Sequence, residues 1–154
     1  KVKAQAYTSL VHPQLDYASE VWNPNTTSEI NRLEQIQRSA ARFVYSDYSR
    51  YTHVSPLVKE LNWDPLHTRR LIQQATMFYK IHYGLVHISP PNCLQRAHYI
   101  SSRKDHPLKY TNLTYPRVNA YKFAFYPRAM AIWNRLPGEA VIKELTPLHG
   151  CHIL

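Results

Sequence analysis

Hydrophobic positions in the first half of the chain recur at helical rather than strand spacing. The clearest pattern begins behind Thr26 and ends near Val44, with apolar residues three or four positions apart. Thr26 and Glu29 have the spacing of a capping box, which closes the first turn of a helix. The pattern therefore predicts an amphipathic helix whose inward positions are Ile30, Leu33, Ile36, Ala40, Phe43 and Val44.

A preceding helical pattern covers the first residues of the chain and is interrupted by proline. Pro13 follows His12, and it should stop or kink the helix because it lacks an amide hydrogen and its ring crowds the preceding turn. Helical spacing then continues as far as Trp22, where Asn23-Pro24 ends it. The inward positions expected before the proline are Ala4, Tyr7, Leu10 and Val11, and those after it are Leu15, Ala18, Val21 and Trp22.

Two further helices are predicted from prolines near their starts. Ser55-Pro56 and Asp64-Pro65 each have the form of an N-cap followed by proline at the first helical position. Gly84 is placed to end the second of these helices. Apolar side chains surround this helix on most sides, which is typical of a central, buried helix. Its polar stripe consists of Arg69, Gln73, Thr76 and Lys80.

Periodicity fades from about residue 89 to residue 119 and then returns for a last short helix. The irregular stretch predicts a basic loop or a short β-hairpin near residues 95–118. Behind Pro127, apolar residues at helical spacing predict a helix in which Trp133 faces a core. The whole pattern predicts a mainly α fold, a helical bundle with that loop or hairpin. The large aromatic residues assigned to its core are Trp22, Trp63, Trp133, Phe43 and Phe78.

Positive charge is concentrated in one part of the chain. The 154 residues carry a formal net charge of +9. Residues 1–65 hold seven Lys/Arg and seven Asp/Glu, and residues 136–154 hold one against two. Residues 66–135, called the basic block below, hold eleven Lys/Arg against Asp105 alone. Such a contiguous block is typical of a surface that faces a polyanion, although charge also serves solubility.

The end of the basic block combines aromatic rings with cations. Residues 121–137 contain five aromatic residues, two arginines and one lysine. Cations neutralise phosphates and exposed rings stack on unpaired bases, so this composition favours a nucleic-acid partner, although it could also build a small core. The tyrosines expected to stack are Tyr110, Tyr115, Tyr121 and Tyr126. The predicted nucleic-acid-binding residues are Arg69, Lys80, Arg103, Lys104, Lys109, Arg117, Tyr121, Lys122, Tyr126, Arg128 and Arg135.

The sequence contains no recognisable catalytic motif. It has no paired aspartates of the kind that hold metal in a polymerase, no Gly-rich phosphate loop and no nucleophile that can be singled out. We therefore assign no catalytic residue, no metal site and no cofactor. His149, Cys151 and His152 lie close together near the end of the sequence, and Cys93 is the other cysteine. Zinc sites space their ligands in two tight pairs, and these four residues do not have that spacing. Whether they bind a metal is left open.

Cysteine usage and hydropathy indicate the cellular compartment of the protein. Two cysteines are too few for a disulfide scaffold, which favours a reducing environment. No apolar run approaches the roughly eighteen residues of a membrane span, and no signal peptide is visible. The sequence thus predicts an intracellular protein, nuclear or cytoplasmic, with no membrane partner. Its start at Lys1, inside a helical pattern, indicates a piece of a longer polypeptide.

Several motifs of the chain resemble, in order, one family of polymerases. Ala6-Tyr-Thr-Ser-Leu-Val-His-Pro-Gln-Leu-Asp-Tyr-Ala-Ser19 is similar to the segment just downstream of the catalytic core in reverse transcriptases of non-LTR (LINE-type) retrotransposons, of the jockey and chicken-repeat kind. The chain departs from that family at His12, where arginine is usual, and at Ala124-Phe-Tyr126, where Ser-Phe-Phe is usual. The other similar motifs lie at residues 21–24, 33–43, 61–64 with Arg69-Arg70, 77–81 before 84–86, 121–128 and 133–137.

The resemblance implies a division into thumb-like helices over residues 1–48 and a post-thumb helical and basic linker over residues 49–154, packed as one unit of a larger polyprotein. It further implies a non-catalytic C-terminal segment of an RNA-directed DNA polymerase, whose partners are RNA or DNA and the polymerase core of the parent polypeptide. Magnesium is expected only in that missing catalytic core. Two alternatives remain: a protein-interaction module that docks on the polymerase core, and a decayed remnant of a retroelement.

Overall fold

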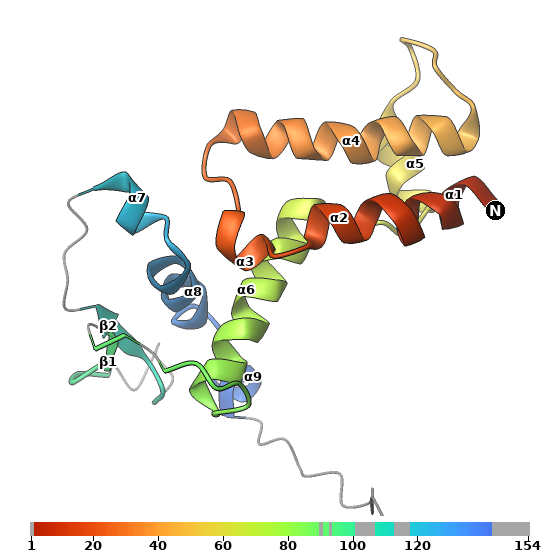
Figure 1. Ribbon diagram of the computed structural model, residues 1–154. Coiled ribbons are helices and arrows are strands. Elements are labelled where there is room, and N and C mark those ends of the chain that lie inside the picture. Colours follow the sequence, from red (N-terminus) through yellow and green to blue (C-terminus); the bar gives the residue numbers. More distant parts are fainter. Residues whose placement is uncertain (1, 90, 93, 101–106, 113–117, 143–154) are drawn as a thin grey trace, which may run out of the picture.

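The chain is mainly helical and carries a small two-stranded antiparallel sheet, as the sequence predicted. The computed structural model describes residues 2–89, 91–92, 94–100, 107–112 and 118–142. Within these residues no helix is both long and apolar enough to cross a membrane. Figure 1 shows the elements, which in chain order are α1 (Val2–Ala6), the π-helical η1 (Tyr7–Val11), α2 (His12–Asp16), α3 (Ser19–Trp22), α4 (Thr27–Tyr45), α5 (Val54–Glu60), α6 (Leu66–His82), β1 (Leu94–Arg96), β2 (Tyr110–Asn112), α7 (Asn119–Lys122), α8 (Phe125–Trp133) and α9 (Gly138–Ile142).

Helix α6 lies at the centre and contacts helices from both halves of the chain (Figure 1). Its first half packs against α2, α3 and α4, and its second half packs against α8. The prediction of a central helix is therefore confirmed. Leu71 and Ile72 are nevertheless exposed, because the buried stripe of α6 includes two polar residues in their place. This stripe consists of Leu66, Arg70, Gln74, Phe78 and Ile81.

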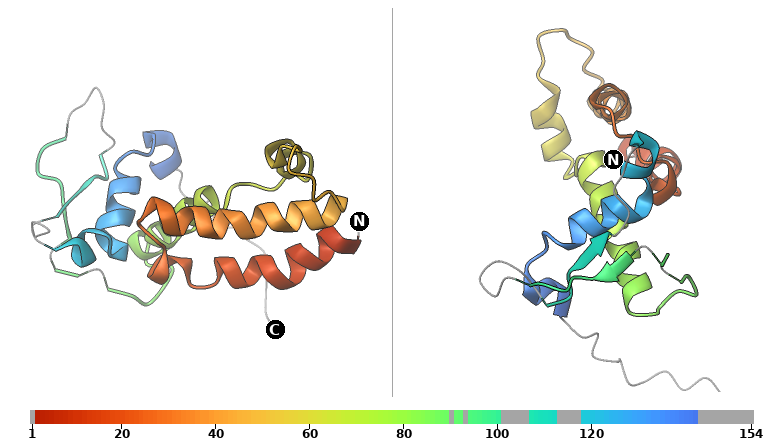
Figure 2. Two further views of the ribbon diagram at one scale, coloured as in Figure 1. Left: turned by 90° about the horizontal axis from the view of Figure 1, so that it is seen from above. Right: turned by 90° about the vertical axis from the view of Figure 1, so that its left-hand side faces the viewer.

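Helices α1, η1 and α2 form one continuous rod that runs antiparallel beside α4 (Figures 1 and 2). In the middle of this rod the backbone hydrogen bonds widen to a π pattern, in which the His12 N–H bonds to the Tyr7 carbonyl five residues back. Pro13 follows immediately, and it brings no amide hydrogen and a bulky ring. The interruption predicted at this proline takes the form of a wide turn.

The wide turn changes which residues of the rod face inward. Tyr7 is buried, and the next inward positions are His12 and Leu15. Regular α-helical spacing, at i+4 and i+7 from Tyr7, would have placed each of them one residue earlier. Leu10 and Val11 are instead exposed at 67% and 38%. The expectation that these two face inward is wrong because the extra residue in the turn rotates the helix face by about 100°.

Helix α4 begins as the capping box predicted. Thr26 Oγ1 accepts a hydrogen bond from the Glu29 N–H at 3.3 Å and donates one to Glu29 Oε2 at 2.8 Å. At the other end, Lys3 Nζ donates to the Phe43 carbonyl at 3.2 Å, where a cation suits the helix dipole. The inward assignment of Ile36 and Phe43 is wrong, because α1 and α5 cover only part of the apolar arc of α4 and leave both side chains exposed.

The starts of α5 and α6 are displaced from their predicted positions. The N-cap of α5 is His53, and Pro56 lies at the third helical position. The N-cap of α6 is Pro65, and no side chain caps this helix. Neither Ser55 nor Asp64 therefore acts as the predicted N-cap. Both helices still begin within two residues of a proline, whose fixed φ suits a first turn.

Gly84 ends α6 as the sequence predicted. Its φ of +67° lies in the left-handed region that favours glycine. The Gly84 N–H bonds to the Ile81 carbonyl at 3.2 Å, and the Leu85 N–H bonds to the Lys80 carbonyl at 2.8 Å. This pair of bonds is a Schellman motif, which satisfies carbonyls that the helix end would otherwise leave unpaired.

The core of the second half forms between α6 and α8. Phe78, Ala129, Trp133 and Val141 are buried together. The Trp133 ring lies 5.3 Å from that of Phe78, and its Nε1–H donates to the Leu108 carbonyl at 2.8 Å. The prediction that Trp133 faces a core is confirmed, because both its apolar body and its polar edge have partners.

The two strands pair within the stretch where the sequence predicted a loop or hairpin. Leu94 lies opposite Asn112, and Arg96 lies opposite Tyr110. Asn134, just behind α8, bonds both backbone groups of Tyr110: its Oδ1 accepts at 3.0 Å and its Nδ2 donates at 2.8 Å. This side chain therefore acts as a further strand partner and attaches β2 to the end of α8.

The predicted core aromatic residues divide into three groups. Phe78 and Trp133 are buried as expected. Trp63 is partly buried and its ring lies 4.5 Å from that of Tyr7. Trp22, like Phe43, is exposed, and the assignment of both to the core is wrong. Trp22 lies on the short helix α3 at the edge of the molecule, where one face of its ring meets a guanidinium instead of apolar neighbours.

We expect Trp133→Ala to lower the free energy of unfolding by about 3–5 kcal/mol, the usual cost of emptying a large aromatic site in a core. Urea denaturation followed by circular dichroism measures this change. The matched control is Ile72→Ala on α6, an exposed side chain whose loss should change stability by less than about 0.5 kcal/mol. Equal effects of the two substitutions would contradict the described core.

Candidate nucleic-acid interface

The structure separates the cations of the basic block into two groups. Of the eleven Lys/Arg in this block, eight lie in the described residues. Among these eight, Arg69, Arg70 and Arg128 donate hydrogen bonds to distant parts of the chain. The described residues do not include three of the predicted site residues, Arg103, Lys104 and Arg117, nor do they include Tyr115. The second group comprises Lys80, Arg96, Lys109, Lys122 and Arg135.

Arg69 is held by a carboxylate of the N-terminal rod. Its Nε and Nη2 donate to Asp16 Oδ2 at 3.1 and 2.7 Å, across 53 positions of sequence. The Asp16 side chain is mostly buried, so this pair is shielded from solvent on one side. Arg69 was predicted to contact nucleic acid, but in this geometry two of its donors join α6 to α2.

Arg70, the next residue, is buried to 2% exposure. Its Nη2 donates to the Leu15 carbonyl at 2.8 Å, and its guanidinium lies 4.5 Å from the centre of the Trp22 ring. Burial lowers the pKa of Arg70, whereas the nearby carboxylates of Asp16 and Glu34 act in the opposite direction. The carbonyl, the ring and the two carboxylates together stabilise a cation that has left water.

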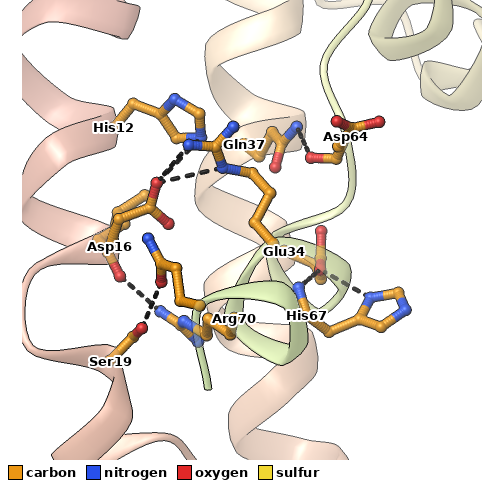
Figure 3. Close-up of polar contacts among 11 residues, drawn as sticks. His12, Asp16, Ser19, Glu34, Gln37, Asp64, His67 and Arg70 are labelled. Atoms are coloured by element: carbon orange, nitrogen blue, oxygen red, sulfur yellow. Dashed lines mark hydrogen bonds and ion pairs between the residues drawn. The ribbon is translucent and has the colours of Figure 1, made fainter. Parts of the chain in front are cut away.

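These arginines belong to a polar junction where α2, α3, α4 and α6 meet (Figure 3). The Ser19 hydroxyl donates to Gln73 Oε1, which ties α3 to α6. On the other side Gln37 Nε2 donates to the Asp64 carbonyl at 3.1 Å. Glu34 Oε1 accepts from the His67 N–H at 2.9 Å, so its side chain turns to the first turn of α6.

Burial shifts the pKa of two more groups in this junction. Burial first, and then the carboxylates of Asp16 and Glu34, raise the pKa of Tyr7 to about 12, so its hydroxyl stays neutral. Burial, followed by the Arg69 guanidinium, lowers the pKa of His12, against the opposing effect of Asp16. The junction therefore holds a neutral phenol and a neutral imidazole beside one strong ion pair.

Arg128 binds the turn between α3 and α4. Its Nη1 donates to the Asn23 carbonyl at 2.7 Å and its Nη2 reaches the Pro24 carbonyl at 3.4 Å. Burial lowers the pKa of this guanidinium. Arg128 was predicted to contact phosphate, but here it joins α8 to a segment more than a hundred residues earlier in the chain.

The remaining described cations of the basic block are at least partly exposed. Lys80, Arg96, Lys122 and Arg135 are exposed, and Lys109 is half-buried. They are carried by the C-terminal end of α6, by β1, by the residue before β2, by the end of α7 and by the residues just behind α8, and these segments lie in the part of the molecule away from α4 and α5 (Figures 1 and 2). In the described part of residues 66–141, Glu139 is the sole carboxylate. This side of the molecule is thus cationic.

The tyrosines predicted to stack on bases lie mostly against the core. Tyr126 packs on the Trp133 cluster, and burial raises its pKa. Tyr110 meets Phe78 edge to face at 5.4 Å, and its hydroxyl lies 2.7 Å from His82 Nδ1. Tyr121 is half-buried. Of the four predicted tyrosines, the three described ones therefore present at most part of a ring to solvent.

The most exposed tyrosines lie where the sequence pattern gave no expectation. Tyr48 and Tyr51, on the loop between α4 and α5, are exposed at 67% and 94%. Tyr17 and Tyr99 are also exposed, at the α2–α3 junction and behind β1. The sequence did carry a signal for the exposure of the loop tyrosines. Aromatic residues stand there among Ser, Asp and Arg, and no apolar periodicity predicts that they are buried.

Known proteins give no guide to the site. Comparison of the chain with protein-family models, with curated proteins and with solved structures found no match. Within the part of the chain that the structure describes, no group of three or more His, Cys, Asp or Glu side chains is arranged to hold a metal ion. The late histidines and cysteines considered as zinc ligands lie outside that part.

The neutral imidazole in the junction makes stability depend on pH. Because the pKa of His12 is lower in the folded chain than in the unfolded one, the unfolded chain binds more protons, and stability should fall as the pH drops below about 6.5. We expect His12→Gln to reduce this loss in urea denaturation at pH 7.5 and 5.5. NMR titration of the imidazole provides the direct test, and a midpoint at or above 6.5 would contradict the described environment.

Proposed function

We propose that this chain binds RNA or DNA without catalysing a reaction, as the C-terminal segment of a retrotransposon RNA-directed DNA polymerase. The cationic side of the second half is the observation that carries this proposal. Its exposed cations are Lys80, Arg96, Lys122 and Arg135, and Glu139 is the sole carboxylate in the described part of residues 66–141. The order of motifs that resemble the post-core region of LINE-type reverse transcriptases supports the choice of this family.

The exposed cations suit contact with phosphates and not with bases. Lys and Arg side chains at a surface displace counterions from a nucleic-acid backbone, and this contribution is independent of sequence. The cations lie on helices and strands that are fixed to the α6–α8 core, so their spacing is set before a strand binds. Template RNA and target DNA offer the same phosphate chemistry, and both remain candidate partners.

The internally bonded arginines support the proposal in a different way. Arg69 and Arg70 fix the thumb-like helices to α6, and Arg128 fixes the α3–α4 turn to α8. The cationic side and the N-terminal helices are thereby held as one body in this structure. Such a body can hold a strand in a constant orientation relative to a polymerase core to which it is joined.

A salt titration on a labelled single-stranded RNA tests this function. If four phosphates are engaged, log affinity should fall with log salt at a slope of about −3. Lys80→Gln combined with Arg135→Gln should make the slope shallower by about 1.4, because each lost contact on a single strand removes about 0.7. Fluorescence anisotropy at several salt concentrations gives both numbers.

The matched control for this titration is Arg32→Gln combined with Lys59→Gln. These two exposed side chains lie on α4 and α5, so the variant has the same net charge as the test variant but keeps the cationic side intact. It should retain the wild-type slope. A flat titration for the wild-type chain, or equal slopes for the two double variants, would contradict the proposal.

A second candidate function is docking on the polymerase core of the parent polypeptide. Large apolar side chains remain exposed along the N-terminal helices, namely Val2, Leu10 and Val21, which are 80%, 67% and 85% exposed. Apolar surface of this kind marks contacts with other proteins when it forms a continuous patch. The observation favours a docking role for α1–α3, beside or in place of nucleic-acid binding.

Under this second candidate, the isolated chain should self-associate through its uncovered apolar side chains. Leu10→Glu combined with Val21→Glu places charge on that surface and should restore a monomer. Gel filtration with light scattering across a concentration series measures the mass of both proteins. A wild-type chain that stays monomeric throughout the series would remove the support for docking by this surface.

A further inference from the structure

A second cationic feature lies outside the basic block, at the junction of α4 and α5. There the surface is hollowed to a volume of about 330 Å³. Its walls are Gln35, Arg38 and Arg42 from α4 together with residues 52–55, which end the α4–α5 loop and begin α5. The hollow is therefore built within residues 1–65, which hold as many acidic as basic side chains.

The lining of this hollow is suited to an anion. Arg38 and Arg42 stand one helical turn apart, an arrangement in which like charges destabilise a helix. His53 adds an imidazole and Ser55 adds a hydroxyl donor, whereas the Thr52 side chain already bonds the Asp47 carboxylate. None of the lining residues is a carboxylate. An anion in the hollow would relieve the repulsion and accept these hydrogen bonds.

A neighbouring cleft shows the contrast. It has a volume of about 750 Å³ and lies on the other side of Arg38, between α4, α5 and the first turn of α6. There Glu34 and Asp64 balance Arg38 and Lys59, so the larger cleft has no net preference for an anion. The smaller hollow differs in having no carboxylate among its lining residues; Asp47, in the adjoining loop, is near enough to Arg42 for the two charges to interact.

Donors remain for a ligand in the hollow. Arg42 uses three of its five N–H groups on backbone carbonyls, at 2.7 Å to Ser49, 3.1 Å to Thr52 and 3.4 Å to Asp47. Two of its N–H groups are thus left over. Arg38 is exposed and makes no hydrogen bond or ion pair with any described residue. Between them the two side chains can donate to one phosphate from adjacent directions.

The same bonds fix the shape of the loop above the hollow. Arg42 binds carbonyls at both ends of residues 47–52, and Asp47 Oδ1 accepts from the Ser49 N–H at 3.0 Å. The bond from Ser49 holds the pKa of Asp47 below its ordinary value, with a smaller contribution from the Thr52 side chain. The loop, visible above α4 and α5 in Figure 1, is therefore braced from inside by a guanidinium and a carboxylate.

This braced loop carries the exposed aromatic rings. Tyr48 and Tyr51 are 67% and 94% exposed, and Arg50 between them is exposed as well. Rings this open make no contribution to a core, whereas base stacking on an aromatic side chain is independent of sequence and strong. Aromatic rings and a cation thus stand beside a hollow that suits an anion. This arrangement matches an unpaired strand, along which bases alternate with phosphates.

We propose that the α4–α5 junction is a second contact for single-stranded nucleic acid. One phosphate of the strand occupies the hollow at Arg38 and Arg42, and adjacent unpaired bases stack on Tyr48 and Tyr51. The proposal rests on the proposed function, since both need a nucleic-acid partner. It adds a separate contact in the first half of the chain that the distribution of formal charge did not indicate.

Anisotropy titrations with a fluorescein-labelled single-stranded oligouridine, performed on the whole chain, test the site. We expect Tyr48→Ser combined with Tyr51→Ser to weaken binding at least tenfold and to leave the salt slope unchanged, because stacking releases no counterions. Arg38→Gln should instead make the slope shallower by about 0.7. These three side chains are exposed, so the variants should fold, which their thermal unfolding confirms.

Matched controls separate this site from the cationic side. Tyr17→Ser removes an equally open ring at the α2–α3 junction, and Arg32→Gln removes an exposed cation elsewhere on α4. Both should bind like the wild type. If the loop variants also bind like the wild type while Lys80→Gln with Arg135→Gln binds less well, the second contact is overturned and the proposed function stands. If the wild-type chain binds no oligonucleotide, both proposals fall.

Discussion

The burial of the Arg70 guanidinium fixes how the first half of the chain is placed on α6. Moving this cation out of water is unfavourable unless partners surround it, and they come from separate elements: the Leu15 carbonyl from α2, the Trp22 ring from α3 and the Glu34 carboxylate from α4. The charge is stabilised only when these helices are all in place. A packing of α6 that left out any one of them would expose or isolate the cation, so the junction selects one arrangement of helices.

The same reasoning explains why a block of positive charge does not translate directly into a binding surface. A guanidinium can satisfy backbone carbonyls as well as phosphates, and the chain uses Arg128 for the former at the α3–α4 turn. Lysines are less suited to bridging several acceptors, and Lys80 and Lys122 remain exposed. Within the described part of the basic block, Arg69, Arg70 and Arg128 bond to other parts of the chain, whereas Lys80, Arg96, Lys122 and Arg135 stay exposed.

Sequence reasoning was most successful where a local rule determined the structure. The Thr26 cap, the Gly84 helix end and the inward face of Trp133 depend on neighbouring residues, and each is confirmed. It failed where the outcome depended on distant parts. The π turn before Pro13 shifted the inward face away from Leu10, and no periodicity rule contains that shift. Nothing near the arginines in the sequence indicated which acceptors they would bond. Tyr48 and Tyr51 became candidates for base stacking only once the structure showed their rings exposed on a braced loop.

Helix α6 also sets a length scale. Its seventeen residues rise about 25 Å, and its two ends face different neighbours: the α4–α5 side at the start, and the strands with α8 at the finish (Figure 1). Because the helix is capped by a Schellman motif and packed along its whole course, this separation is constant. Along one strand of a duplex, 25 Å corresponds to about seven nucleotides. Two ligand groups that bound at the two ends of α6 would therefore be held about 25 Å apart.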